Sequence, residues 1–256
     1  MPGDESPAWR DEDGRQELRG PLLALETSGD QGSLAVGGAD GTPLGVTTLP
    51  ARRRQAAEAA PAAVRILEEA GVAPDELAGV LVGAGPGSFT GVRVAAATAK
   101  GWARYLEIPL WTGSSLAAAA LAGVAPDGSS ASELSEGPGP LRYVLFDARG
   151  DRVYGACYRV DDAGVATVVE AHAGTVADVL DTGPDPRTVF VGAGARRHRE
   201  LLERAGYMVA EEPWGDPSAR SLLVLAGRAP SLLARAGPTW EPTYVRASNA
   251  ERSWNG

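Results

Sequence analysis

The sequence predicts an α/β protein built as two lobes, each with a mixed sheet covered by helices. Short apolar runs alternate with glycine-rich turns and helical segments along the chain. A strand–turn–strand pattern near residue 22 recurs near residue 143, and a Val-Gly-Ala-Gly run at 82–85 recurs at 191–194. Each Val-Gly-Ala-Gly run follows an apolar strand and precedes a helical segment. Because the matches keep their order, duplication of one α/β unit is the favoured explanation.

The first lobe is expected over residues 21–122. It opens with a hairpin, Leu22–Leu25 and Ser33–Val36, and a third strand is expected around Leu44–Leu49. Apolar residues at helical spacing predict a helix over 55–70, in which Pro61 either delays the start to Ala60 or bends the helix. The remaining elements are a strand at Gly79–Val82, a helix at Val92–Tyr105, a strand at Pro109–Trp111 and a helix at Ser114–Ala122.

The second lobe is expected over residues 141–256, after a loop-like linker at 123–140. Its opening hairpin, Tyr143–Tyr158, matches the first one. Asp147, Gly150 and Asp151 fall on Glu26, Gly29 and Asp30 of that first hairpin, each 121 positions later. Residues 1–20 form an acidic tail without apolar periodicity, which we expect to be disordered.

Composition excludes several kinds of protein. The 256 residues carry a net charge of −9, which argues against a protein that grips nucleic acid alone. A single cysteine, Cys157, fits a cytoplasmic location, and no apolar stretch is long enough for a membrane span or a secretory signal. His172 and His198 are the only histidines and Lys100 the only lysine, so HExxH, Cys/His zinc and Walker A motifs are absent.

The densest candidate signal is the run Gly85-Pro-Gly-Ser-Phe-Thr-Gly-Val-Arg93. Its glycines permit close backbone approach, and Ser88 or Thr90 can cap the helix that follows. The free N–H groups of that helix could bind an anion. The structural alternative, which the residue chemistry alone favours, is a tight strand-to-helix turn beside a packed internal helix. A dinucleotide fingerprint would need glycine at Ser88, so the spacing does not fit.

Other candidate residues admit a functional and a structural reading. Glu26 and Asp147 end matched strands and could hold Mg²⁺ in a nucleotide cleft, or could be solvated turn carboxylates. Ser28 with a histidine would be a nucleophile–base pair, although nothing in the sequence places them together. Cys157 lies on an apolar strand and is expected in the core.

The run GAGPGSFTGVRVAAATAKGWA at 83–103 resembles the hallmark of the TsaB (YeaZ) family. The opening strand to Ser28 is similar to the family's, with Glu26 where Asp is usual. Further resemblance lies in Ile108–Leu110 with Gly113–Leu116, in Phe146–Tyr154, and in the closing motif at Pro242–Arg246 with Ala250 and Glu251. The resemblance covers about residues 21–252.

The resemblance implies a duplicated actin/hexokinase/Hsp70-like fold, which is ribonuclease H-like in each lobe. It implies no independent catalysis and no cofactor: the TsaD-type paralogues carry a metal-binding histidine pair, whereas the corresponding run Arg54–Glu58 here has no histidine. The implied role is that of a partner of a TsaD-type transferase and a TsaE-type ATPase, which together modify the tRNA adenosine 3′ of the anticodon. The chain would contact transfer RNA only as part of the complex. When free of its partners, it could form a homodimer.

The resemblance also implies where the partner binds. The expected partner interface comprises Gly85, Pro86, Gly87, Ser88, Phe89, Thr90, Gly91, Arg93, Ala95, Ala96 and Ala99. Glu26, Thr27, Ser28 and Asp147 mark a degenerate nucleotide cleft, in which we expect weak binding or none. The alternative functions are a glycoprotease-like metallohydrolase and a nucleotide-dependent kinase of the same fold.

Overall fold

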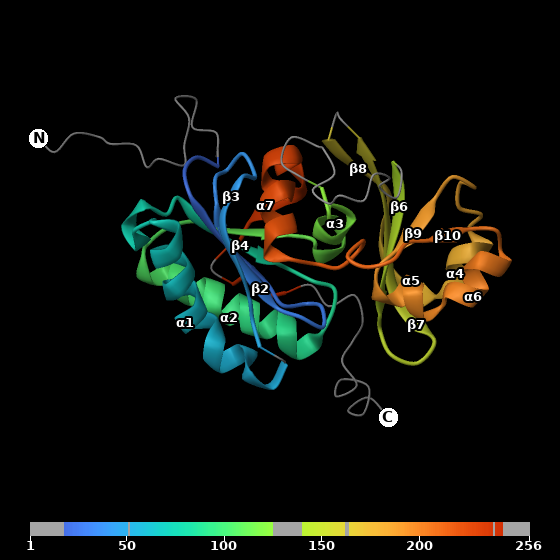
Figure 1. Cartoon of the computed structure of the whole chain (residues 1–256), viewed down its shortest axis with the longest axis horizontal. Coiled ribbons are helices and arrows are strands. Elements are labelled where there is room, and N and C mark those ends of the chain that lie inside the picture. Colours follow the sequence, from blue (N-terminus) through green and yellow to red (C-terminus); the bar gives the residue numbers. More distant parts are fainter. Residues whose placement is uncertain (1–17, 51, 125–139, 162–163, 238, 243–256) are drawn as a thin grey trace, which may run out of the picture.

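Two sheets with helices on their faces organise the molecule, as Figure 1 shows. The computed structural model describes residues 18–50, 52–124, 140–161, 164–237 and 239–242. The acidic tail, the linker and the closing motif predicted from the sequence therefore fall largely outside the described residues. Within the described ranges, each helix is too short or too polar to traverse a lipid bilayer.

The first sheet has the strand order β11-β5-β4-β1-β2-β3. Its strands are β1 (Leu22–Glu26), β2 (Ser33–Gly37), β3 (Pro43–Thr48), β4 (Gly79–Gly83), β5 (Leu110–Gly113) and β11 (Leu233–Arg235). Strands β1, β2 and β3 form an antiparallel meander, β4 pairs parallel with β1, and β5 pairs parallel with β4. The hairpin and third strand predicted from the sequence are thereby confirmed.

The second sheet repeats this plan with the order β10-β9-β6-β7-β8. Its strands are β6 (Leu141–Asp147), β7 (Arg152–Asp161), β8 (Gly164–Thr175), β9 (Val189–Val191) and β10 (Met208–Val209). Again three antiparallel strands are followed by a parallel fourth and fifth. The matched order confirms the predicted duplicated α/β fold with a mixed sheet in each lobe.

Seven α-helices among the described residues cover the sheets. They are α1 (Arg52–Ala70), α2 (Phe89–Tyr105), α3 (Ser115–Ala120), α4 (Val176–Asp181), α5 (Ala193–Arg197), α6 (Arg199–Arg204) and α7 (Ala219–Arg228), with 3-10 turns η1 (Pro74–Glu76) and η2 (Pro230–Leu232). Helix α1 continues through Pro61. The proline removes the hydrogen bond to the Ala57 carbonyl, but both residues are exposed, so water can satisfy that carbonyl.

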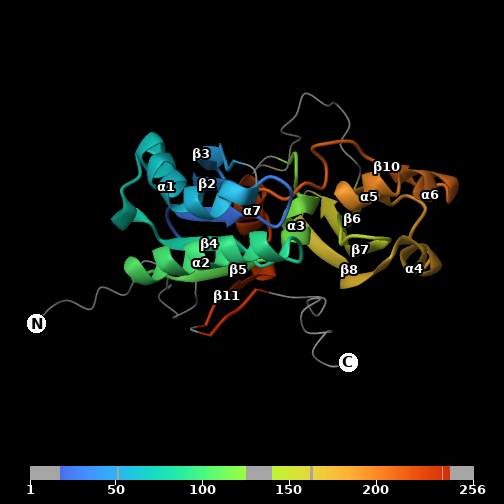
Figure 2. The ribbon, with the colours of Figure 1, turned by 90° about the horizontal axis from the view of Figure 1, so that it is seen from below.

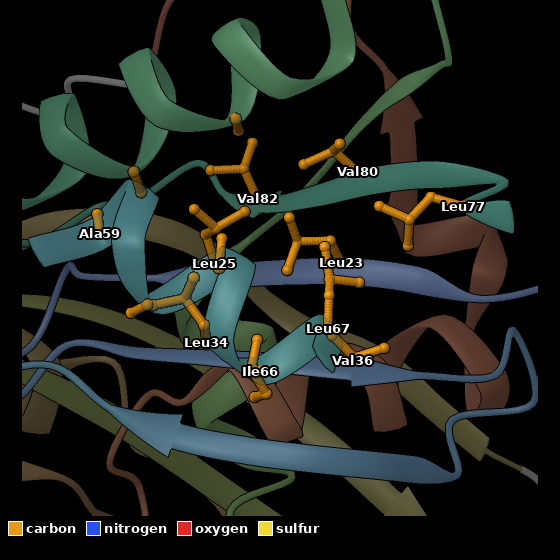
Figure 3. Close-up of a cluster of buried hydrophobic side chains, with 14 of the residues drawn as sticks. Leu23, Leu25, Leu34, Val36, Ala59, Ile66, Leu67, Leu77, Val80 and Val82 are labelled. Carbon is orange, nitrogen blue, oxygen red and sulfur yellow. The ribbon is translucent and has the colours of Figure 1, made fainter. Parts of the chain in front are cut away.

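Both faces of the central strand β1 are buried, which makes the first lobe a three-layer structure. Alternate residues of a strand point to opposite faces, so Leu23 and Leu25 pack under α1 and α2, whereas Leu22 and Ala24 pack under α7. Figure 3 shows the α1 side of this core, where Ile66 and Leu67 meet the side chains of β1, β2 and β4.

The two lobes exchange elements. Helix α3 comes from the first half of the chain but packs on β6 and β7 of the second sheet, and α7 comes from the second half but packs on β1, β2 and β4. These two helices also contact each other between the sheets (Figure 1). The chain then adds β11 to the edge of the first sheet beside β5, which Figure 2 shows from below. The spatial lobes therefore differ from the halves 21–122 and 141–256 at these three elements.

Candidate functional site

The glycine-rich loop between β4 and α2 is fastened to the end of β1. The Ser88 N–H donates to the Ser28 carbonyl at 2.8 Å, and the Thr27 hydroxyl donates to the Gly91 carbonyl at 2.5 Å. These two contacts hold the α2 end of the loop and the first turn of α2 against one short segment. Because Thr27 and Ser28 are buried, water does not compete for these bonds.

The glycines of this loop are explained by close packing. A Cβ atom on Gly91 would lie 1.9 Å from the Thr27 carbonyl oxygen, and one on Gly87 would lie 2.6 Å from the Ser28 carbonyl oxygen. No other residue type fits at these positions without moving the backbone. The sequence leaves an anion site and a tight turn as interpretations of the motif, and these contacts support the tight turn.

The loop leads directly into α2. The Ser88 side chain accepts a hydrogen bond from the Gly91 N–H at 3.3 Å, so Ser88, and not Thr90, is the N-cap. Phe89 remains 43% exposed at the first turn, and the Arg93 guanidinium lies 3.8 Å from the centre of its ring. The helix therefore begins with an exposed aromatic–cationic pair.

The three alanines expected at a partner interface lie inside the chain, and this part of the expectation is corrected. Ala95, Ala96 and Ala99 are 0%, 5% and 0% exposed because their face of α2 packs against α1 and β4. The opposite face is exposed, and its residues are Thr90, Arg93, Ala97, Gly101, Arg104 and Tyr105. We call this set the α2 outer face. Both faces of α2 thus carry small side chains: Ala95, Ala96 and Ala99 on the buried face, and Ala97 and Gly101 on the exposed face.

Glu26 is fully buried and is bound by neighbouring backbone and hydroxyl groups. Its Oε1 accepts from the Ser28 N–H at 2.6 Å, and its Oε2 accepts from the Ser115 hydroxyl at 2.7 Å. Burial raises the pKa of the Glu26 carboxyl, and hydrogen bonds from Ser28 and Ser115 oppose that rise. Glu26 is therefore neither the solvated turn carboxylate nor the open Mg²⁺ ligand that its place in the sequence allows.

Asp147, the sequence match of Glu26, is placed differently. It is partly exposed, its Oδ1 accepts from the Arg149 N–H at 2.8 Å, and its Oδ2 forms an ion pair with Arg197 at 2.8 Å. Its hydrogen bond and its ion pair thus join it to Arg149 and Arg197, and not to Glu26, Thr27 or Ser28. Among the described residues no group of three or more His, Cys, Asp or Glu side chains is gathered as metal ligands are.

The second glycine-rich turn is filled by the protein itself. A Cβ atom on Gly192 or Gly194 would lie 2.7 or 2.8 Å from the Leu145 carbonyl oxygen. The Gly192 N–H donates to the Trp214 carbonyl at 3.1 Å, and Arg196 binds both that carbonyl and Asp216. These glycines therefore serve the packing of strand β6 and of the segment at 214–216.

The candidate nucleophile and bases lie apart in the fold. Ser28 follows β1, whereas His172 lies on β8 and His198 lies between α5 and α6. The His172 Nε2 atom is 2.8 Å from the Tyr143 hydroxyl, and burial lowers the pKa of His172. Cys157 is buried as predicted, and desolvation raises the pKa of its thiol to about 11, so it is mostly un-ionised at neutral pH.

Sequence reasoning missed two residues of this site, Gly83 and Ser115. Ser115 lies 89 residues from Glu26, and its role depends on α3 starting beside β4 and β5. Gly83 leaves room for the carboxylate, since a Cβ there would lie 2.0 Å from the Glu26 Oε2 atom. The only available signal was the presence of Gly83 and of Ser114-Ser115 in runs that resemble family segments.

Comparisons with known proteins agree with this architecture. The family model described as TsaD, tRNA N6-adenosine threonylcarbamoyltransferase, matches residues 43–254. A Bacillus subtilis protein named tRNA threonylcarbamoyladenosine biosynthesis protein TsaB is 28% identical over 243 residues, which cover 91% of this chain and 97% of that protein.

Two solved structures from Pseudomonas aeruginosa are similar over most of the chain. One, described as an uncharacterized protein with similarity to peptidase YeaZ, has a TM-score of 0.72 at 27% identity and covers 89% of this chain and 100% of its own. The other, YeaZ, has a TM-score of 0.66 at 27% identity, covering 83% and 92%. The chain belongs to the family that the TsaD model describes and, within it, to the TsaB (YeaZ) proteins.

Proposed function

We propose that this chain is a non-catalytic partner subunit in tRNA threonylcarbamoyladenosine biosynthesis. It would bind a TsaD-type transferase that moves a threonylcarbamoyl group onto the adenosine 3′ of the anticodon, with a TsaE-type ATPase in the same cytoplasmic complex. The name of the Bacillus subtilis relative supports the pathway. Transfer RNA would be bound mainly by the other subunits, in keeping with the net charge of −9.

The observation that carries the proposal is how the glycine-rich motif is used. The carbonyl groups of Thr27 and Ser28 fill the space beside its glycines, so the loop would have to open before it could bind a phosphate. What the motif presents outward is Phe89 and the α2 outer face. A motif that builds a rigid helix start and an exposed helix face suits binding of another protein.

The other candidate chemical groups are likewise engaged internally. Glu26 and the turn at 192–194 are packed against the chain's own atoms, and Cys157 is buried. These contacts weigh against the glycoprotease-like and kinase alternatives, each of which needs exposed groups at such positions. The proposal assigns catalysis to the transferase.

The α2 outer face fits close contact with a second helix. Ala97 and Gly101 are exposed one turn apart, and no atom outside the helix backbone lies within 4 Å of the Cβ position of Gly101. Small residues at this spacing let another backbone approach, while Phe89 and Tyr105 offer aromatic contacts at the two ends. We propose this face, in place of Ala95, Ala96 and Ala99, as the binding surface for the transferase.

A charge placed on this face tests the proposal. Ala97→Glu should leave the chain folded, because Ala97 is exposed, but it should weaken binding of the TsaD-type transferase roughly 30-fold, about 2 kcal/mol. The measurement is titration calorimetry together with a melting curve. Ala177→Glu, at an exposed helical alanine of α4, is the matched control and should bind as the native chain does.

Two outcomes would count against this surface. Native affinity in the folded Ala97→Glu variant would place the interface elsewhere. Equal loss in the Ala177→Glu control would show that the effect comes from charge in general. The same variant tests self-association, because a homodimer through the α2 outer face should dissociate with the same substitution.

A further inference from the structure

We propose that Glu26 is the positioning residue of the partner site: its carboxylate, through the Ser115 hydroxyl, fixes the glycine-rich loop and so the start of α2. This inference rests on the proposed function, since it concerns the surface proposed to bind the transferase. A buried glutamate thus holds a loop at a position where the sequence allowed a Mg²⁺ ligand.

Glu26 joins three segments that are far apart in the sequence. Its Oε1 accepts from Ser28 in the turn after β1, and its Oε2 accepts from Ser115 at the start of α3. Ser115 in turn clamps Gly85, accepting from the Gly85 N–H at 3.1 Å with its hydroxyl and donating its own N–H to the Gly85 carbonyl at 2.9 Å. The chain of bonds runs without interruption from the carboxylate to the first glycine of the loop.

The far end of the loop depends on the same turn. Ser28 accepts from the Ser88 N–H, and Thr27 donates to the Gly91 carbonyl, so fixing the β1 end also fixes the N-cap of α2. Ser88 in turn caps α2 through the Gly91 N–H. Phe89, the first exposed residue of the helix, lies between these two attachment points.

The bonding pattern requires an acceptor at both carboxylate oxygens. An ionised Glu26 accepts from both donors and leaves the Ser115 oxygen free to accept from Gly85. A protonated carboxyl loses this arrangement. A proton on Oε1 faces the hydrogen of the Ser28 N–H, and a proton on Oε2 faces the hydrogen of the Ser115 hydroxyl, which then loses its acceptor. The loop is therefore best held when Glu26 is ionised.

The groups that act on the Glu26 carboxylate carry no charge. They are the backbone amides of Thr27 and Ser28 and the hydroxyls of Ser28 and Ser115, and the neighbouring position on β4 is Gly83. Burial consequently raises the pKa of Glu26. Since the folded pKa exceeds the unfolded one, the contribution of this group to folding stability is present below the unfolded pKa and lost as the pH rises through the folded pKa.

Two properties should therefore change in opposite directions with pH. As the pH falls through the folded pKa of Glu26, protonation raises the free energy of unfolding, while the loop loses a hydrogen bond. Burial of any titrating acid would change the stability in this way, so the loss of loop protection is the property that distinguishes a positioning residue from one that only fills space. The Glu26→Gln variant should abolish both changes, because glutamine keeps the shape, carries no titrating group and brings an unwanted donor to one of the two oxygen positions.

The experiment compares the native chain with Glu26→Gln, Ser115→Ala and the control Glu170→Gln, an exposed glutamate on β8. Amide exchange of residues 85–91 is measured as protection factors over the whole pH range in which the native chain stays folded, beside urea unfolding and transferase affinity. Native loop protection should fall about tenfold toward low pH, as expected for loss of a hydrogen bond to a charged group. In Glu26→Gln the loop protection factors should be low and independent of pH. In Ser115→Ala they should be low at every pH, and in Glu170→Gln they should match those of the native chain.

Each outcome bears on the proposal separately from the proposed function. Native-like loop protection and pH dependence in Glu26→Gln would overturn it. If Ser115→Ala does not fold, the native pH profile and Glu26→Gln still decide. If the native chain fails to bind the transferase, the proposed function is wrong, but exchange of the free loop still shows whether Glu26 positions it.

Discussion

At the scale of single residues, matched sequence positions acquire different environments. Glu26 and Asp147 end equivalent strands, yet Glu26 is enclosed by Ser28 and Ser115, whereas Asp147 is partly exposed and pairs with Arg197. The sequence predicts that both carboxylates follow a strand, because strand ends depend on local pattern. It cannot predict their burial, because Ser115 and Arg197 approach from 89 and 50 residues away.

Gly91 gives a direct test of the packing explanation for the motif. Gly91→Ala should destabilise the chain by about 1–3 kcal/mol, because the added Cβ would lie 1.9 Å from the Thr27 carbonyl oxygen and the backbone must shift. Urea unfolding of the free protein measures the change. An alanine variant as stable as the native chain would mean that the close contact does not exist in solution.

At the scale of elements, periodicity predicts where helices and strands lie but not which side of a helix is free. The apolar spacing places a helix after Gly91, and the structure has α2 over Phe89–Tyr105. Because alanine and glycine occur on both sides of this helix, composition could not separate Ala95, Ala96 and Ala99, which face α1 and β4, from Ala97 and Gly101, which face outward.

Gly101 separates the stability of α2 from its binding. Gly101→Ala should stabilise the free chain by roughly 0.5–1 kcal/mol, because alanine has the better helix propensity and its Cβ meets no atom within 4 Å. The same methyl group should weaken transferase binding, because it projects from the face on which a second helix would pack. A raised melting temperature with undiminished affinity would exclude close helix packing at this position.

At the scale of the whole molecule, duplication was visible in the sequence but the exchange of elements was not. The repeated hairpins and Val-Gly-Ala-Gly turns predict two equivalent sheets, which the matched strand orders confirm. Helices α3 and α7 and strand β11 pack across the halves instead. Each of the two helices buries apolar side chains against the sheet of the other half, and β11 extends the edge of the first sheet beside β5. Local pattern carries no information on that choice.

The two lobes are consequently expected to unfold together. Helix α7 contributes side chains to cores on both sides, including Leu222 and Leu223 on the first sheet and Val224 and Leu225 on the second. Separation of the lobes would expose at least one of these two pairs, because α7 can stay packed on only one sheet. A partner that binds the α2 outer face therefore meets a surface supported by one connected structure.

The most direct test of the central claim is reconstituted tRNA modification with the TsaD-type transferase, the TsaE-type ATPase, the threonylcarbamoyl adenylate and tRNA, with and without this chain. The modified nucleoside is quantified by mass spectrometry after digestion of the tRNA. We predict modification only when the chain and the transferase are both present, none with the chain alone, and a large loss with Ala97→Glu. Modification by the chain alone, or equal modification without it, would contradict the account of a non-catalytic partner subunit.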